Sequence, residues 1–138
     1  MVRLGARPLF NYGFLGSSYL RIFFLGNIAE RSTYFEILLD STKPTYTKRW
    51  EKDYIKPGAR KLYHEQVKGL TEKDFAKLQG LLSALELDTI RHRQQCTVAR
   101  GLTYIVELHY PEGYYFLYRC DPEDRTIGEM VRFVVNLQ

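Results

Sequence analysis

The sequence has few of the residues from which metal sites are built. Only two of its 138 residues are cysteine, and its three histidines lie far apart, at His64, His92 and His109. Zinc ligands usually recur at short spacings such as Cys-x-x-Cys or His-Glu-x-x-His, and neither spacing occurs in this chain. We therefore expect no metal site and no cofactor.

The two cysteines, Cys96 and Cys120, are compatible with two redox states. Both can be buried thiols in a cytosolic protein, or they can form one disulfide in a periplasmic protein. Cys120 ends a predicted strand and Cys96 lies in the segment that leads to its partner strand, so a bridge between them is geometrically feasible. Their spacing does not decide between a cytoplasmic and a periplasmic location.

The chain also lacks a long apolar run. Its N-terminal apolar segment is interrupted by Asn11, by the pair Ser17 and Ser18, and by Arg21, and no clear small-x-small cleavage site follows. No stretch reaches the roughly 18 uninterrupted apolar residues that a membrane-spanning helix needs. We expect neither a signal peptide nor a membrane span in this chain.

Two widespread catalytic or nucleotide-binding motifs are missing as well. Gly16-Ser17-Ser18 lacks the flanking glycines of a hydrolase nucleophile elbow, and no glycine-rich loop ends in Lys-Ser or Lys-Thr as a phosphate-binding loop does. Hydrolase and nucleotide-binding functions are therefore disfavoured.

Tyrosine is what the chain has in excess. It carries 11 Tyr, 8 Phe and 1 Trp, a composition that favours a sheet-rich core or a binding surface. The net charge of +4 is compatible with an acidic partner but is small for a nucleic-acid-binding protein. The length and the 45% of hydrophobic residues predict one globular domain over residues 1–138.

The hydrophobic pattern changes its period once along the chain. β-branched and aromatic residues separated by turn signals predict extended segments at 19–25, 33–39, 46–55 and 61–67. Thr71 then precedes an apolar repeat with helical spacing, which predicts a helix over 72–85, and Thr126-Ile-Gly-Glu129 is a capping box that predicts a second helix. With a hairpin between the helices, we expect an α+β domain: an antiparallel sheet of about five to six strands with two helices packed on one face.

The hairpin between Leu102 and Tyr118 carries the most suggestive side chains. A three-residue loop, Pro111-Glu112-Gly113, would gather most of its aliphatic and aromatic residues on one core face. In that register the other face carries Glu107 close to Arg119 and His109 opposite Tyr115. We interpret these four residues, Glu107, His109, Tyr115 and Arg119, as a solvated ion pair and His–Tyr pair, or alternatively as a small ligand-binding or acid–base site.

The same hairpin carries a resemblance. The pattern Gly101-x-x-Tyr104-x-x-Glu107, followed by Tyr114, Arg119, Pro122 and a short apolar helix, resembles the C-terminal signature of a family of small uncharacterised bacterial proteins. The resemblance covers the C-terminal half of the chain. This sequence departs from the family pattern by having Tyr104 where Trp is usual, and Cys120 where an aromatic residue is usual. The resemblance implies an exported or envelope-associated bacterial protein, and it implies no mechanism.

Basic and aromatic residues alternate in two further segments, residues 48–56 and 91–93. Such residues can pair with phosphates and stack on bases, but Glu51 and Asp53 dilute the first segment. Trp, Tyr and Arg also anchor protein interfaces. We therefore expect a non-enzymatic protein-binding domain of bacterial origin, such as an immunity protein that neutralises a toxin, and a nucleic-acid-binding module is the alternative. The candidate contact residues are Trp50, Tyr54, Arg91 and Arg93.

Overall fold

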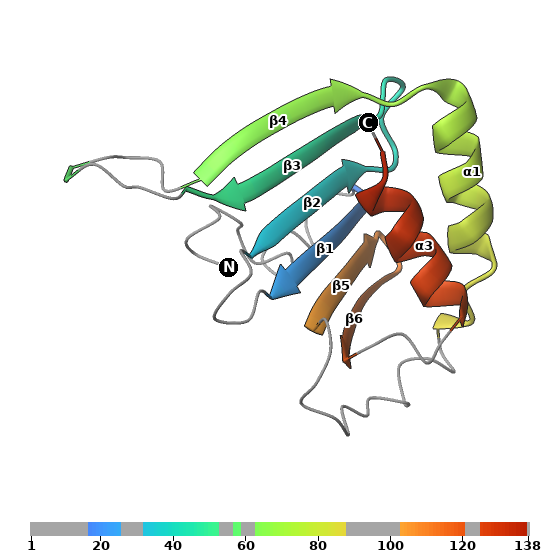
Figure 1. The fold of residues 1–138 in the computed structure, drawn as a ribbon. Helices are drawn as coiled ribbons and strands as arrows, with labels where there is room; N and C mark the ends of the chain where they lie inside the picture. The colour runs from blue at the N-terminus through green and yellow to red at the C-terminus, as the bar shows by residue number, and fades with distance from the viewer. Residues whose placement is uncertain are drawn as a thin grey trace.

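The computed structural model describes residues 17–25, 32–52, 57–58, 63–87, 103–120 and 125–137. They form six strands: β1 (Tyr19–Leu25), β2 (Thr33–Leu38), β3 (Thr45–Glu51), β4 (Tyr63–Gly69), β5 (Thr103–Tyr110) and β6 (Gly113–Cys120). Two helices, α1 (Glu72–Ser83) and α3 (Arg125–Val135), follow β4 and β6. The expected α+β class with an antiparallel sheet and two helices is confirmed (Figure 1).

The strands form one sheet in the order β4-β3-β2-β1-β5-β6, and every neighbouring pair is antiparallel. The first four strands follow one another across the sheet as a meander. β5 then returns to the free edge of β1, so that residues far apart in the sequence become neighbours. β1 and β5 therefore each have a neighbouring strand on both sides, and β4 and β6 form the two edges.

One face of the sheet shares its hydrophobic core with both helices, and we call it the helix-side face. Leu20 and Ile22 of β1 lie across from Leu108 and Val106 of β5. All four side chains point to this face, because side chains alternate between the two faces along a strand. The same buried cluster includes apolar side chains of α1 and α3: Leu78, Leu82, Ile127, Met130, Val131 and Val134. Figure 1 shows the two helices side by side at one end of the sheet.

The second face is also buried at its centre. Phe23, Tyr34 and Ile105 form a separate small cluster there, with Tyr63 and Phe116 packed against it. Residues 104–109 of β5 are consecutively buried, so this strand lacks a solvated face. A strand of this kind does not reveal its register by alternation alone.

The expected register of the hairpin is wrong for this reason. Tyr110 pairs with Gly113, so the loop has two residues, Pro111 and Glu112, and Leu108 lies across from Tyr115. Our expectation assumed one dry face and one wet face, which favoured the longer loop. Because both faces of β5 are buried, the apolar residues did not have to gather on one side.

The ends of several elements differ from the expectation. α3 begins at Arg125, so Thr126 lies inside its first turn and is not the N-cap of a capping box. At α1 the sequence signal is confirmed: the Thr71 hydroxyl accepts a hydrogen bond from the Asp74 amide at 3.1 Å. The expected strand over 46–55 is observed as β3, and its last three residues lie outside the described residues.

Replacing Leu117 by alanine tests the hairpin register. Leu117 is buried on the helix-side face across from Val106, so we expect the free energy of unfolding to fall by about 2–5 kcal/mol. Gln79→Ala, at an exposed position of α1, is the control and should cost less than about 0.5 kcal/mol. Urea unfolding measures both values, and a similarly small cost for the two variants would contradict the register.

Candidate binding face and charge ladder

The side chains of β3 alternate between the two faces of the sheet. In Tyr46-Thr-Lys-Arg-Trp50, the side chains of Tyr46, Lys48 and Trp50 point to the helix-side face, and those of Thr47 and Arg49 to the second face. Tyr46 belongs to the main core with the helices, whereas Trp50 does not join that core in the described part of the chain. The helix-side face therefore extends beyond the core that the helices share with it.

Trp50 is held by its neighbours on both strands. Its ring stacks on that of His64, directly opposite on β4, with the centroids 5.4 Å apart and the planes at 28°. The Lys48 ammonium lies 5.7 Å from the Trp50 centroid and 5.7 Å from the Phe35 centroid, a distance at which cation–π attraction acts. The side chain of Trp50 is thus oriented before any partner binds.

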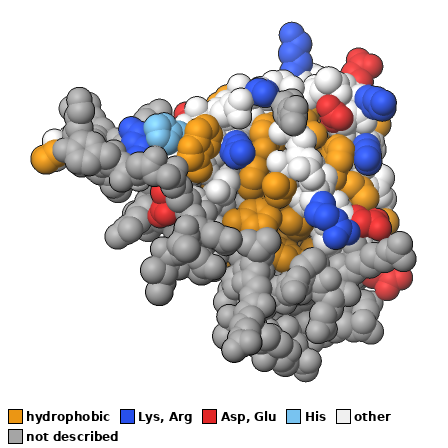
Figure 2. All heavy atoms as spheres, viewed as in Figure 1, with side chains coloured by type: hydrophobic (Ala, Val, Ile, Leu, Met, Phe, Trp, Pro, Cys, Tyr) orange, Lys and Arg blue, Asp and Glu red, His pale blue; other side chains and the backbone are white. Residues whose placement is uncertain are grey.

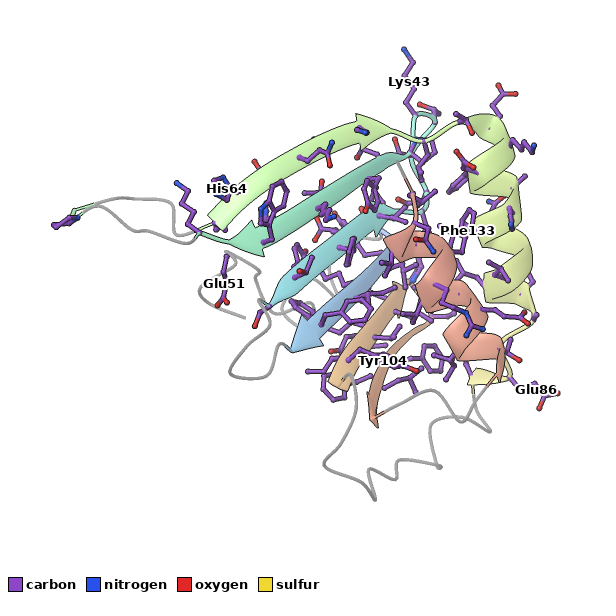
Figure 3. All side chains as sticks on the ribbon, in the orientation of Figure 1. Lys43, Glu51, His64, Glu86, Tyr104 and Phe133 are labelled. Atoms are coloured by element: carbon purple, nitrogen blue, oxygen red, sulfur yellow. The ribbon has the colours of Figure 1, made fainter. Side chains whose placement is uncertain are left out.

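These residues form a continuous surface, which we call the Trp50 platform. Its members lie on the helix-side face of β3 and β4, and they are Lys48, Trp50, His64, Gln66 and Lys68. The three residues from β4 are exposed, while Lys48 and Trp50 are half-buried. Figure 3 shows His64 at the end of β4 that is remote from Phe133 on α3, and Figure 2 shows the histidine beside hydrophobic and basic side chains.

A row of alternating charges crosses the second face. Arg21 of β1 lies directly across from Glu36 of β2 and from Glu107 of β5. Its Nε donates to Glu36 Oε2 at 2.7 Å, and its terminal nitrogen lies 3.8 Å from Glu107 Oε2. Arg21 is 5% exposed and Glu107 is 4% exposed, so this is a buried guanidinium between two carboxylates.

The row continues through an aromatic ring. Tyr34 of β2 donates its hydroxyl hydrogen to Glu36, and its ring centroid lies 5.9 Å from the Arg21 guanidinium and 5.5 Å from that of Arg49. Arg49 Nε in turn donates to Glu65 Oε2 at 2.6 Å. We call these residues the charge ladder: Glu107, Arg21, Glu36, Tyr34, Arg49 and Glu65.

Burial and the adjacent Glu36 carboxylate raise the pKa of Tyr34 well above its ordinary value. The Tyr34 hydroxyl therefore keeps its proton at neutral pH and donates it in the hydrogen bond to Glu36. The charges of the ladder alternate along the sheet, so Arg21 supplies a counter-charge to Glu107, although Glu107 Oε2 accepts no hydrogen bond within the described residues.

Tyr114 and Ser17 make further polar contacts with β5. The Tyr114 hydroxyl donates to Glu107 Oε1 at 2.7 Å, and burial followed by this hydrogen bond raises the pKa of Tyr114. His109 Nδ1 lies 2.7 Å from the Ser17 carbonyl oxygen. Since a carbonyl only accepts, Nδ1 of His109 carries the donated hydrogen. Glu107 and His109 therefore both form hydrogen bonds with neighbours within the fold.

The four hairpin residues that the sequence analysis grouped do not lie on one face. Glu107 and His109 are on the second face, whereas Tyr115 pairs with Leu108 and Arg119 pairs with Tyr104, positions of the helix-side face. The expected proximity of Glu107 to Arg119, and of His109 to Tyr115, is therefore wrong. The cause is the shift of register by one residue.

The charged partners of Glu107 were missed by the sequence analysis. Arg21 and Glu36 come from strands that are distant in sequence from β5, and Arg49 and Glu65 extend the row toward the edge. Arg21 itself was a signal in the sequence, because a charged residue in the middle of the apolar Tyr19–Leu25 segment requires a partner of opposite charge when it is buried. The sequence could not say which acid supplies it.

The structure describes only some of the other residues that the sequence singled out. Trp50 lies in the Trp50 platform, and Tyr54, Arg91, Arg93 and Cys96 lie outside the described residues. Cys120 ends β6, where it pairs with Thr103. The Cys96–Cys120 bridge therefore stays a prediction.

The structure offers few ligands for a metal. Across the described ranges, no group of three or more His, Cys, Asp or Glu side chains is close enough to hold an ion. None of the helices in the described part of the chain is long and apolar enough to cross a membrane.

Comparisons of the chain with family models, with curated proteins and with solved structures give no match. The resemblance of the C-terminal half to small bacterial proteins stays a prediction.

Substituting Arg21 and Arg49 separately compares how much a buried ion pair and a half-exposed ion pair each contribute to stability. Arg21→Met leaves Glu107 buried without its counter-charge, so we expect the free energy of unfolding to fall by about 3–5 kcal/mol. Arg49→Met removes a pair with partly exposed side chains and should cost about 1 kcal/mol or less. Adding Glu107→Leu to Arg21→Met should recover part of the loss, and urea unfolding of the parent, Arg21→Met, Glu107→Leu and the double variant gives the cycle. Equal costs for the two arginine variants would show that burial does not set the strength of the ladder.

The loss of stability at alkaline pH tests whether burial raises the pKa of Tyr46. Burial raises the pKa of Tyr46 to about 12, whereas an unfolded tyrosine titrates near about 10. The unfolded state therefore releases this proton first, and stability present below about pH 10 is lost as the pH rises toward about 12. The Tyr46 hydroxyl finds no hydrogen-bond partner within the described residues, so Tyr46→Phe should fold as well as the parent at neutral pH.

We expect Tyr46→Phe to lose less stability than the parent between about pH 10 and about pH 12. Urea unfolding at each pH measures the difference. Parallel losses in parent and variant would mean that the Tyr46 hydroxyl titrates as it does in the unfolded chain.

Proposed function

We propose that the protein is a non-enzymatic binding protein, that its partner is another protein, and that the Trp50 platform is the contact surface. The observation that carries the proposal is the stacked Trp50–His64 pair with Lys48 beside it, on a part of the sheet where β4 is exposed. The charged side chains of the ladder, by contrast, are engaged with one another.

The platform has the physical properties of an interface anchor. Tryptophan contributes strongly to protein interfaces because it buries a large apolar area. Binding costs less conformational entropy when the anchoring side chain is already held, and Trp50 is held by His64 and Lys48. The platform also sits on two hydrogen-bonded strands and not on a loop, which keeps the contact residues at fixed distances.

Charge indicates the kind of protein surface that the platform fits. Lys48 and Lys68 place two cations on the platform, and the chain carries a net charge of +4. An acidic rim on the partner would pair with these lysines and would speed association.

An immunity protein that neutralises a bacterial toxin is one form of this proposal. It is consistent with a small domain that presents a preformed aromatic and basic surface. A toxin encoded by the neighbouring gene, inhibited by this protein and released by a substitution in the platform, would support this form.

A nucleic-acid-binding function is the second candidate, and the same arrangement favours it. Single strands bind surfaces in which aromatic rings stack on bases beside cations that pair with phosphates. Lys48 and Trp50 offer both groups. Glu51, the next residue of β3, points to the second face, and its Oε2 accepts a hydrogen bond from the Ser32 amide at 3.3 Å.

Affinity capture with matched variants tests the proposal. Immobilised parent protein, Trp50→Ala and Arg132→Ala are exposed to lysate, and a protein retained by the parent is then purified and titrated by calorimetry. Arg132 is exposed on α3, outside the platform, so Arg132→Ala controls for the loss of a large side chain elsewhere on the surface. We expect Trp50→Ala to weaken binding by about 30-fold or more and Arg132→Ala to weaken it by less than about threefold.

Binding that survives Trp50→Ala unchanged would move the contact surface away from the platform. If no protein is retained, and RNA or DNA binds with an affinity that falls steeply with salt, the second candidate replaces the first.

A further inference from the structure

The outer edge of β4 is an open hydrogen-bonding edge. β4 pairs with β3 from Tyr63 to Gly69 in an uninterrupted register, and in the described part of the chain it has no strand on its other side. Every β4 residue from His64 to Gly69 is exposed. An edge strand presents unpaired backbone N–H and C=O groups, which form a template for another strand.

β4 lacks most of the features that usually block such pairing. It contains no proline, and its regular register with β3 leaves no bulge. Val67 is 57% exposed, and it is the large hydrophobic side chain that the described residues leave in solvent. β6, the opposite edge, differs because its residues 113–116 are half-buried.

We propose that two copies of the chain associate through β4, with the two β4 strands antiparallel and Val67 at the twofold axis. The product is a continuous antiparallel sheet across both protomers. This inference does not depend on the proposed function of the Trp50 platform.

The sequence of β4 selects this register. Directly opposite residues in an antiparallel pair point to the same face, so a twofold axis must pass through a residue position. An axis at Val67 pairs Val67 with its copy, Gln66 with Lys68, and Glu65 with Gly69. No like charges then face each other, and the exposed valine is covered by an apolar partner.

The neighbouring registers are less favourable. An axis at Glu65 sets two carboxylates opposite each other, which is destabilising. An axis at Gln66 sets Val67 against Glu65 and Lys68 against His64, so the valine gains no apolar neighbour. The strand is also nearly neutral, since it carries one lysine and one glutamate, and the +4 charge of the chain is not concentrated there.

Sedimentation of the full chain over a concentration series tests the association. The parent protein should shift from monomer to dimer as its concentration rises. Val67→Lys places two cations opposite each other at the axis and should raise the dissociation constant of the dimer by about tenfold or more. Gln79→Lys, on the exposed surface of α1, adds the same charge elsewhere and should leave the dimer unchanged.

Cysteine substitution tests the register. Under mild oxidation, Val67→Cys should form a disulfide-linked dimer, because its copy lies directly opposite, while Glu65→Cys should not exceed the unsubstituted chain. The unsubstituted chain gives the baseline for the two native cysteines. A monomer at every concentration, a dimer that Val67→Lys leaves intact, or linkage through Glu65→Cys in preference to Val67→Cys would each overturn the proposal.

Discussion

The Arg21 guanidinium between Glu36 and Glu107 is the interaction on which the arrangement of this sheet depends. It joins three strands, β2, β1 and β5, and two of these meet only because the chain returns after a long excursion. A buried guanidinium needs counter-charges at fixed positions, so a slip of either neighbouring strand by one residue would move a carboxylate to the opposite face. The pairing therefore selects one strand order and one register from the many that an apolar sheet permits.

This constraint divides the sheet into two parts. Around Arg21 both faces are buried, one by the core shared with the helices and the other around Phe23, Tyr34 and Ile105. Toward β4 the side chains become exposed and the charge ladder ends in the partly exposed pair of Arg49 and Glu65. The buried part supplies stability, and the exposed part holds the Trp50 platform and the open edge. Both proposals for recognition lie on this exposed part.

The sequence predicted the helices and strands better than it predicted the register of the strands and the partners of their side chains. Short-range signals, such as the β-branched and aromatic residues of β1 and the Thr71 cap of α1, depend on neighbouring residues, and the structure agrees with them. The hairpin register failed because β5 is buried on both faces, which a pattern of wet and dry positions cannot represent. The ladder was not predictable because the partners of Glu107 depend on β1 lying between β2 and β5. Trp50 was a candidate contact residue from its residue type alone, and only the structure shows His64 stacked on it.

Amide hydrogen exchange of the free protein tests the division of the sheet most directly. It should be measured by NMR at a concentration low enough to keep the chain monomeric, because a paired β4 edge would itself be protected. The account predicts the slowest exchange at central positions of β1 and β5, such as Ile22 and Val106, and much faster exchange along β4. Protection of β4 equal to that of β1 and β5 in the monomer would contradict the claim that one half of the sheet is held by Arg21 and the other is open for recognition.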